Sequence, residues 1–136
     1  MNIQLSPSDQ EKLRALGVQS LYLFGSRAQG VPGILSDYDF GLLMEKTGHQ
    51  RGNLTYDQVY EILAPYCHRT KENDVIDIVF VRDITLELQF HIIQYGVVLF
   101  DTDPLARGRF EEDVMCKYCD YRPILDRFDQ AILASL

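Results

Sequence analysis

The sequence lacks several features that would place it in a particular class of protein. It contains no run of 18 apolar residues, so we expect no membrane-spanning helix. Its first residues, MNIQLSPSDQ, lack the basic and apolar regions of a secretory signal, and we therefore expect a cytoplasmic protein. Basic residues number 13 against 20 acidic ones, a net charge of −7, which argues against direct binding of nucleic acid on electrostatic grounds.

Cysteine and histidine are also scarce. Three cysteines, an odd number without a secretion signal, are expected to stay reduced. Cys116 and Cys119 form a single CxxC, but a zinc site requires two more ligands, and neither a second CxxC nor an HxxxH is present. We expect Cys67, Cys116 and Cys119 to be small buried side chains. The histidines fit no ligand pattern: His49, His68 and His91.

The length and composition predict one soluble globular domain spanning residues 1–136. Hydrophobic residues make up 46% of the chain and charged residues 24%, which is typical of a folded domain. No internal repeat, low-complexity tract or linker interrupts the chain. A GxGxxG motif is missing, which argues against a dinucleotide-binding Rossmann domain.

Apolar periodicity and turn residues predict helices that alternate with strands, which is typical of an α/β fold. The predicted strands comprise residues 21–24, 37–44, 74–81 and 97–100. The predicted helices comprise residues 6–17, 55–67, 85–94 and 104–136, with short helical turns at 26–30. We expect Pro65 to end or kink the second helix, and Pro123 to bend the last one.

Residues suited to phosphate binding lie in the stretch 21–43, LYLFGSRAQGVPGILSDYDFGLL. Gly25 and Ser26 form a small-residue turn after the first predicted strand. Such a turn can direct backbone N–H groups and a hydroxyl at an anion. Arg27 follows directly, and its guanidinium could contact a triphosphate oxygen or pair with a nearby aspartate.

Carboxylates suited to metal binding begin the second predicted strand. Strand alternation places Asp37 and Asp39 on one face, about 7 Å apart, with Tyr38 and Phe40 on the other. Two carboxylates this close repel each other and resist burial unless a cation compensates. Mg²⁺ resolves the conflict, because it takes one or two carboxylates and completes its shell with water and substrate phosphate.

A third carboxylate lies within the third predicted strand. Asp77 interrupts the apolar run VIDIVFV, where an unpartnered charge is costly, so we expect it to join the site. The alternative for Asp77 is a strand-edge acid bonded to backbone N–H groups. Asp74 competes for the catalytic role, but its place at the start of the strand is one where a solvated aspartate is ordinary.

Gly25-Ser26, ten residues and then Asp37-x-Asp39 resemble the GSx10DxD signature of the DNA polymerase β-like nucleotidyltransferase superfamily. The small size is similar to that of the minimal nucleotidyltransferases (MNT proteins), many of which are antitoxin partners of HEPN-domain toxins. The stretch QYGVVLFDTD is similar to the one that follows the third acid in such domains. The resemblance implies a mixed sheet of about four strands covered by helices.

The resemblance also implies an activity, that of an antitoxin nucleotidyltransferase using ATP. Two Mg²⁺ ions would be held by Asp37, Asp39 and Asp77, while Gly25 and Ser26 would hold phosphates. The partner would be a cognate HEPN ribonuclease toxin, silenced by transfer of AMP to one of its tyrosines. One alternative is a non-catalytic antitoxin that acts by stoichiometric binding, although an intact set of three acids argues against it. Another is transfer to a small molecule, of the aminoglycoside type, for which we expect the chain to be too short to build an acceptor pocket.

The last predicted helix carries an apolar stripe longer than a small domain needs. Its large residues recur every three or four positions: Phe110, Val114, Tyr118, Tyr121, Leu125, Phe128 and Ile132. We expect the first part to cover the sheet, and the part from 125 to 136 to extend past the domain towards a partner.

Overall fold

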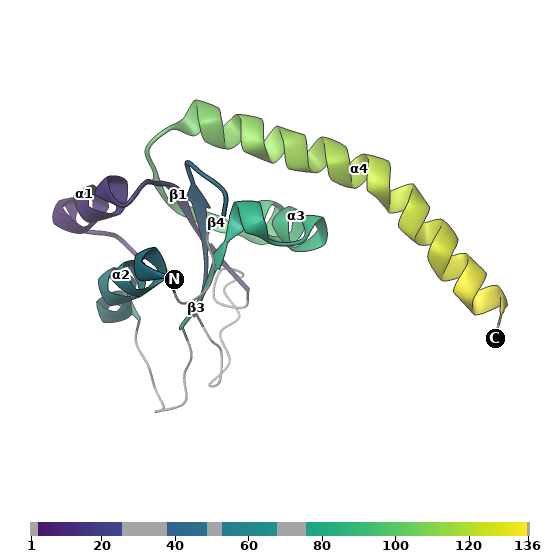
Figure 1. The fold of residues 1–136 in the computed structure, drawn as a ribbon, viewed down its shortest axis with the longest axis horizontal. Helices are drawn as coiled ribbons and strands as arrows, with labels where there is room; N and C mark the ends of the chain where they lie inside the picture. Colours follow the sequence, from purple (N-terminus) through teal and green to yellow (C-terminus); the bar gives the residue numbers. More distant parts are fainter. Residues whose placement is uncertain (1–2, 26–37, 49–52, 68–75, 136) are drawn as a thin grey trace.

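The computed structural model describes residues 3–25, 38–48, 53–67 and 76–135. Several predicted features lie outside these ranges, among them the helical turns at 26–30 and the side chains of Ser26, Arg27, Asp37 and Asp74. The described part of the chain forms a four-stranded sheet with helices on both faces (Figure 1).

The sheet is mixed, as predicted. Its strands are β1 (Val18–Phe24), β2 (Tyr38–Met44), β3 (Ile76–Phe80) and β4 (Val97–Asp101), in the order β3-β2-β1-β4. β1 lies antiparallel to both of its neighbours, β2 and β4, whereas β2 and β3 run parallel. The end of β1 and the beginnings of β2 and β3 therefore meet at one end of the sheet.

Two helices cover each face of the sheet. α1 (Pro7–Ala15) and α2 (Leu54–Leu63) pack against one face through Leu13, Val59 and Leu63, which are fully buried. α3 (Leu86–Tyr95) and α4 (Pro104–Ala134) cover the other face, where Ile92, Phe110 and Val114 are buried. The two apolar clusters are separated by the sheet, because successive residues of each strand point to opposite faces.

Each α-helix in the described part of the chain begins at a polar capping residue whose side chain accepts a hydrogen bond from a backbone N–H. Ser6 caps α1 and is followed by Pro7, which suits the first helical position. Asn53, Thr85 and Asp103 cap the other three helices. α2 ends earlier than predicted, because residues Ala64–Tyr66 around Pro65 form a turn of 3₁₀ helix.

The packing decides which side chains of α3 and α4 are buried, and it corrects the predicted burial of two cysteines. In α3 the fully buried residue is Ile92, while Leu86, Phe90 and Ile93 are only partly buried. The reason is that the sheet lies under one side of α3 and α4 lies on another, so the apolar residues are divided between two neighbours. Cys116 and Cys119 are exposed on α4, and only Cys67 is buried as expected.

α4 is one helix of 31 residues, with Pro123 inside it. Its first half packs on the domain, whereas Figure 1 shows the second half curving away beyond α3. Of the helices that the structure describes, none is long and apolar enough to span a bilayer.

Candidate active site

Two of the predicted acids face each other across neighbouring strands. Asp39 of β2 and Asp77 of β3 are directly paired in the parallel register. Adjacent strands lie about 4.8 Å apart, so the two carboxylates leave the sheet side by side. Tyr38 and Phe40 are completely buried on the opposite face, which confirms the predicted alternation of β2.

Gly25 lies against one of these carboxylates. It follows the last residue of β1, Phe24, which pairs with Asp39 in the antiparallel register. Its φ of 77° belongs to the left-handed region that favours glycine. A Cβ built on Gly25 would fall well inside van der Waals contact with the Asp39 carboxylate. Glycine is therefore needed here for two reasons, the backbone conformation and the close approach of Asp39.

The acids share the sheet face that α3 covers further along the strands. Two residues beyond Asp39 lies Gly41, where a Cβ would meet Val81 and Ile92 at 2.9 and 3.6 Å. α3 thus closes over the middle of the sheet, since Ile92 packs directly on β2. Asp39 and Asp77 are neither buried nor fully exposed, because they lie nearer the end of the sheet. A bound substrate could reach them from that end.

The oxygen-only donor set suits a hard cation. Asp39 and Asp77 can both supply carboxylate oxygens, the ligands that Mg²⁺ prefers. Within the described ranges, no group of three or more His, Cys, Asp or Glu residues could hold a metal ion. The third expected ligand, Asp37, lies outside those ranges, as do Ser26 and Arg27. The roles predicted for these three residues remain predictions.

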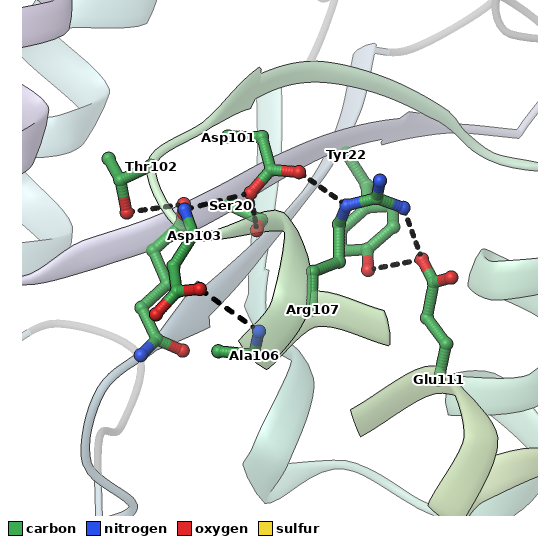
Figure 2. Close-up of polar contacts among 9 residues, drawn as sticks. Ser20, Tyr22, Asp101, Thr102, Asp103, Ala106, Arg107 and Glu111 are labelled. Atoms are coloured by element: carbon green, nitrogen blue, oxygen red, sulfur yellow. Dashed lines mark hydrogen bonds and ion pairs between the residues drawn. The ribbon is translucent and has the colours of Figure 1, made fainter. Parts of the chain in front are cut away.

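A polar network at the other end of the sheet was not foreseen from the sequence (Figure 2). Arg107 of α4 donates from Nε to Asp101 Oδ2 at 2.6 Å and from Nη1 to Glu111 Oε1 at 3.0 Å. The hydroxyl of Tyr22 donates to the same Glu111 oxygen at 2.8 Å, and that of Ser20 donates to Asp101 Oδ1 at 3.1 Å. The network ties the first turns of α4 to β1 and β4.

Two side chains of this network, Tyr22 and Arg107, have shifted pKa values. Burial, and then the hydrogen bond to Glu111, raises the pKa of the Tyr22 phenol, so this hydroxyl stays a donor. The hydrogen bond to Asp101 is the main reason that the pKa of Arg107 is raised. Only the four-residue spacing of Arg107 and Glu111 was readable in the sequence. Their meeting with Tyr22 and Asp101 required the folded sheet.

A groove of about 580 Å³ lies between α1 and α2. Its lining includes Lys12, Leu16, Glu61 and Ile62. It belongs to the helices on the face opposite Asp39 and Asp77, so it is not continuous with the paired acids.

The family of the chain follows from its sequence. Residues 10–105 match the family model described as polymerase beta, nucleotidyltransferase. The matched region includes the paired acids, Gly25 and all four strands. The chain belongs to this nucleotidyltransferase family.

Comparison with solved structures agrees with the fold. A toxin–antitoxin complex with AMP-PNP contains a chain that is 23% identical with a TM-score of 0.62, and the match covers 96% of this chain and 98% of that one. An MNT antitoxin in complex with the tri-AMPylated HEPN toxin of Shewanella oneidensis matches at 18% identity, TM-score 0.56, over 89% and 96% of the two chains. The toxin–antitoxin MntA-HepT matches at 18% identity, TM-score 0.54, over 96% and 97%. The predicted likeness to MNT antitoxins is therefore confirmed at the level of the fold. No curated protein sequence gives a significant match.

Proposed function

We propose that this protein is an antitoxin that transfers AMP from ATP to a tyrosine of a cognate HEPN ribonuclease toxin and thereby silences it. The observation that carries the proposal is the register pairing of Asp39 with Asp77, with the Gly25 turn in contact with Asp39. Family membership supports nucleotidyl transfer. The similar solved chains come from toxin–antitoxin complexes, one with AMP-PNP and one with an AMPylated toxin, which supports both ATP and a protein acceptor.

The residues of this chain would hold the reactants in line. The turn at Gly25 and Ser26 would hold the phosphates, because a glycine backbone allows close approach and the hydroxyl can donate to a phosphate oxygen. Arg27 would add a charge-assisted contact to the triphosphate. Asp37, Asp39 and Asp77 would place their oxygens where the α-phosphate and the acceptor hydroxyl meet.

The transfer is a displacement at the α-phosphorus. The tyrosine oxygen forms a bond to that phosphorus, and the bond to the oxygen that bridges to the β-phosphorus breaks, so pyrophosphate leaves. The phenolic proton passes to Asp77, which lies next to Asp39 and points to the same face. When bound at these carboxylates, a pair of Mg²⁺ ions would stabilise the attacking and leaving oxygens. The protein contributes mainly by positioning the reactants and by placing charged groups next to the reacting atoms.

A direct test is to incubate the chain with α-labelled ATP, Mg²⁺ and the protein encoded beside it, followed by mass spectrometry of both proteins. We expect one or more labelled tyrosines on the neighbouring protein. In Asp39→Ala and Asp77→Ala, labelling should fall roughly 10³-fold or more, because an electrostatic group at the reacting centre is lost. Both variants should stay folded, since each removes a like-charge repulsion. The exposed Asp57 provides the control, and Asp57→Ala should label normally.

Two other outcomes would replace the proposal. No label on either protein, with tight binding and neutralisation retained by Asp39→Ala, would identify an antitoxin that acts by stoichiometric occlusion. Label recovered on a small molecule instead of a protein would indicate transfer of the aminoglycoside type. Unfolding of Asp39→Ala would mean that this carboxylate has a structural role.

A further inference from the structure

The apolar stripe of α4 continues past the point where the helix leaves the domain. Its first members, Phe110 and Val114, are buried against the sheet. Tyr118 then stacks on Phe90 of α3, with ring centroids 3.8 Å apart. Spacings of three and four residues place Tyr121, Ile124, Phe128 and Ile132 on the same side of the helix. We call these last four residues the outer stripe.

In the part of the chain that the structure describes, the outer stripe is largely exposed, although Tyr121 lies beside Thr85 and Leu86 at the start of α3. The exposed fractions of its side chains are 37% for Tyr121, 49% for Ile124, 64% for Phe128 and 58% for Ile132. Four neighbouring large apolar side chains form a patch of the kind that marks an interaction site. An unsupported helical segment of this length is also marginal in water, so contact with a partner would stabilise it.

The groove beside the outer stripe is acidic. It has a volume of about 490 Å³ and is lined by Glu87, Tyr118, Arg122, Leu125, Asp126 and Asp129. The groove thus contains three carboxylates and one guanidinium, and its apolar lining is provided by Tyr118 and Leu125. The matching surface is an apolar segment flanked by lysine or arginine, because complementary charge speeds the encounter and excludes wrong partners.

A second copy of this chain fits the outer stripe less well. Each copy has a net charge of −7, so two copies repel each other on approach. In a two-fold dimer the same patch is used by both copies, so the acidic groove of one copy would approach the acidic groove of the other. Charge therefore favours a different, basic partner.

We infer that the outer stripe and the acidic groove beside it are the docking surface for the toxin, which would contribute an apolar segment flanked by basic side chains. This inference rests on the proposed function. In Figure 1 the second half of α4 runs beyond α3, away from the sheet, and bends down to the level at which β3 begins, the end of the sheet that holds Asp39 and Asp77. A toxin seated on the inner side of α4 would bring its acceptor tyrosine towards these acids.

The test compares two variants of the full chain. Phe128→Ala combined with Ile132→Ala removes the outer end of the stripe, and alanine keeps the helix. Leu105→Ala is the matched control, because Leu105 is 66% exposed on the same helix but off the stripe. Binding of the neighbouring protein is measured by calorimetry without ATP. We expect the double variant to bind at least about 30-fold more weakly than wild type, and the control to bind equally well.

Labelling with α-labelled ATP separates this inference from the proposed function. If the neighbouring protein is never labelled, yet binding is lost only in the double variant, the docking surface stands and the transfer activity fails. If wild type and the double variant bind alike and label with the same KM, the docking surface is wrong while the transfer activity stands. A wild-type dimer that dissociates in the double variant at micromolar concentration would show that a second copy covers the stripe, and would overturn the inference.

Discussion

Replacement of Gly25 by alanine should damage the site more than the fold. Gly25 has a φ of 77°, and its missing Cβ leaves room for the Asp39 carboxylate. Gly48 offers a matched control, because its φ is 87° and a Cβ there would meet nothing within 4 Å. The two substitutions therefore share the backbone cost and differ in the contact with Asp39.

The shared cost is that of an L-residue in the left-handed region, about 1–2 kcal/mol. Gly48→Ala should lose about this much stability and nothing else, since its N–H can still donate to Asp83. Gly25→Ala should lose at least as much and must also displace Asp39. The neighbour that must move is the end of a side chain, so the fold can adapt but the carboxylate cannot keep its position. A displacement of about 1 Å at a reacting centre costs roughly 10²-fold in rate.

The assay pairs urea denaturation with the rate of the proposed AMP transfer to the neighbouring protein. We expect both variants to lose about 1–2 kcal/mol of unfolding free energy, and only Gly25→Ala to lose roughly 10²-fold in rate. Equal transfer rates in the two variants would refute the reasoning, because they would mean that the position of Asp39 does not limit the reaction. A rate loss in Gly48→Ala would show that strain alone impairs the enzyme.

Two further predictions concern stability. Arg107→Ala should lower the free energy of unfolding, measured by urea denaturation, by about 1–3 kcal/mol, because it leaves the half-buried Asp101 without its cation. Lys117→Ala, which removes an exposed ion pair, should lower it by less than about 0.5 kcal/mol. Equal losses in the two variants would contradict this reasoning. The hydrogen bond from Tyr66 lowers the pKa of Asp9, so this bond stabilises the fold above the ordinary aspartate pKa, and its contribution is lost as the pH falls through the lowered one. Tyr66→Phe should therefore be less stable than wild type by a larger margin at pH 6 than at pH 3. A stability difference that is independent of pH would show that this hydrogen bond does not lower the pKa of Asp9.

The secondary structure was largely readable from the sequence because its signals are local. Ser6 and Thr85 cap the helices predicted over residues 6–17 and 85–94, and Pro65 ends α2 in a 3₁₀ turn. The strand boundaries moved by a few residues, as for β1, which begins at Val18. These features depend on a few consecutive residues, which the sequence displays directly.

Part of the candidate site was also proposed from the sequence. The spacing of Gly25 and Asp39 pointed to one phosphate and metal site, and Asp77 was singled out because a charge inside an apolar strand requires a partner. The exposure of Cys116 and Cys119 was not predicted, because a helical face becomes buried only where a neighbouring element covers it.

The sequence alone determined which residues could do chemistry, since composition, capping and strand alternation act within short stretches. Only the tertiary structure decided which of them meet. The parallel register of β2 and β3 pairs Asp39 with Asp77, and the return of α4 over β1 brings Arg107 to Asp101. The stripe of α4 shows the difference most plainly: Val114 and Phe128 obey one periodicity, yet one is buried and the other exposed. Periodicity records which side of a helix is apolar, whereas the extent of the sheet and of α3 sets how much of that side is covered.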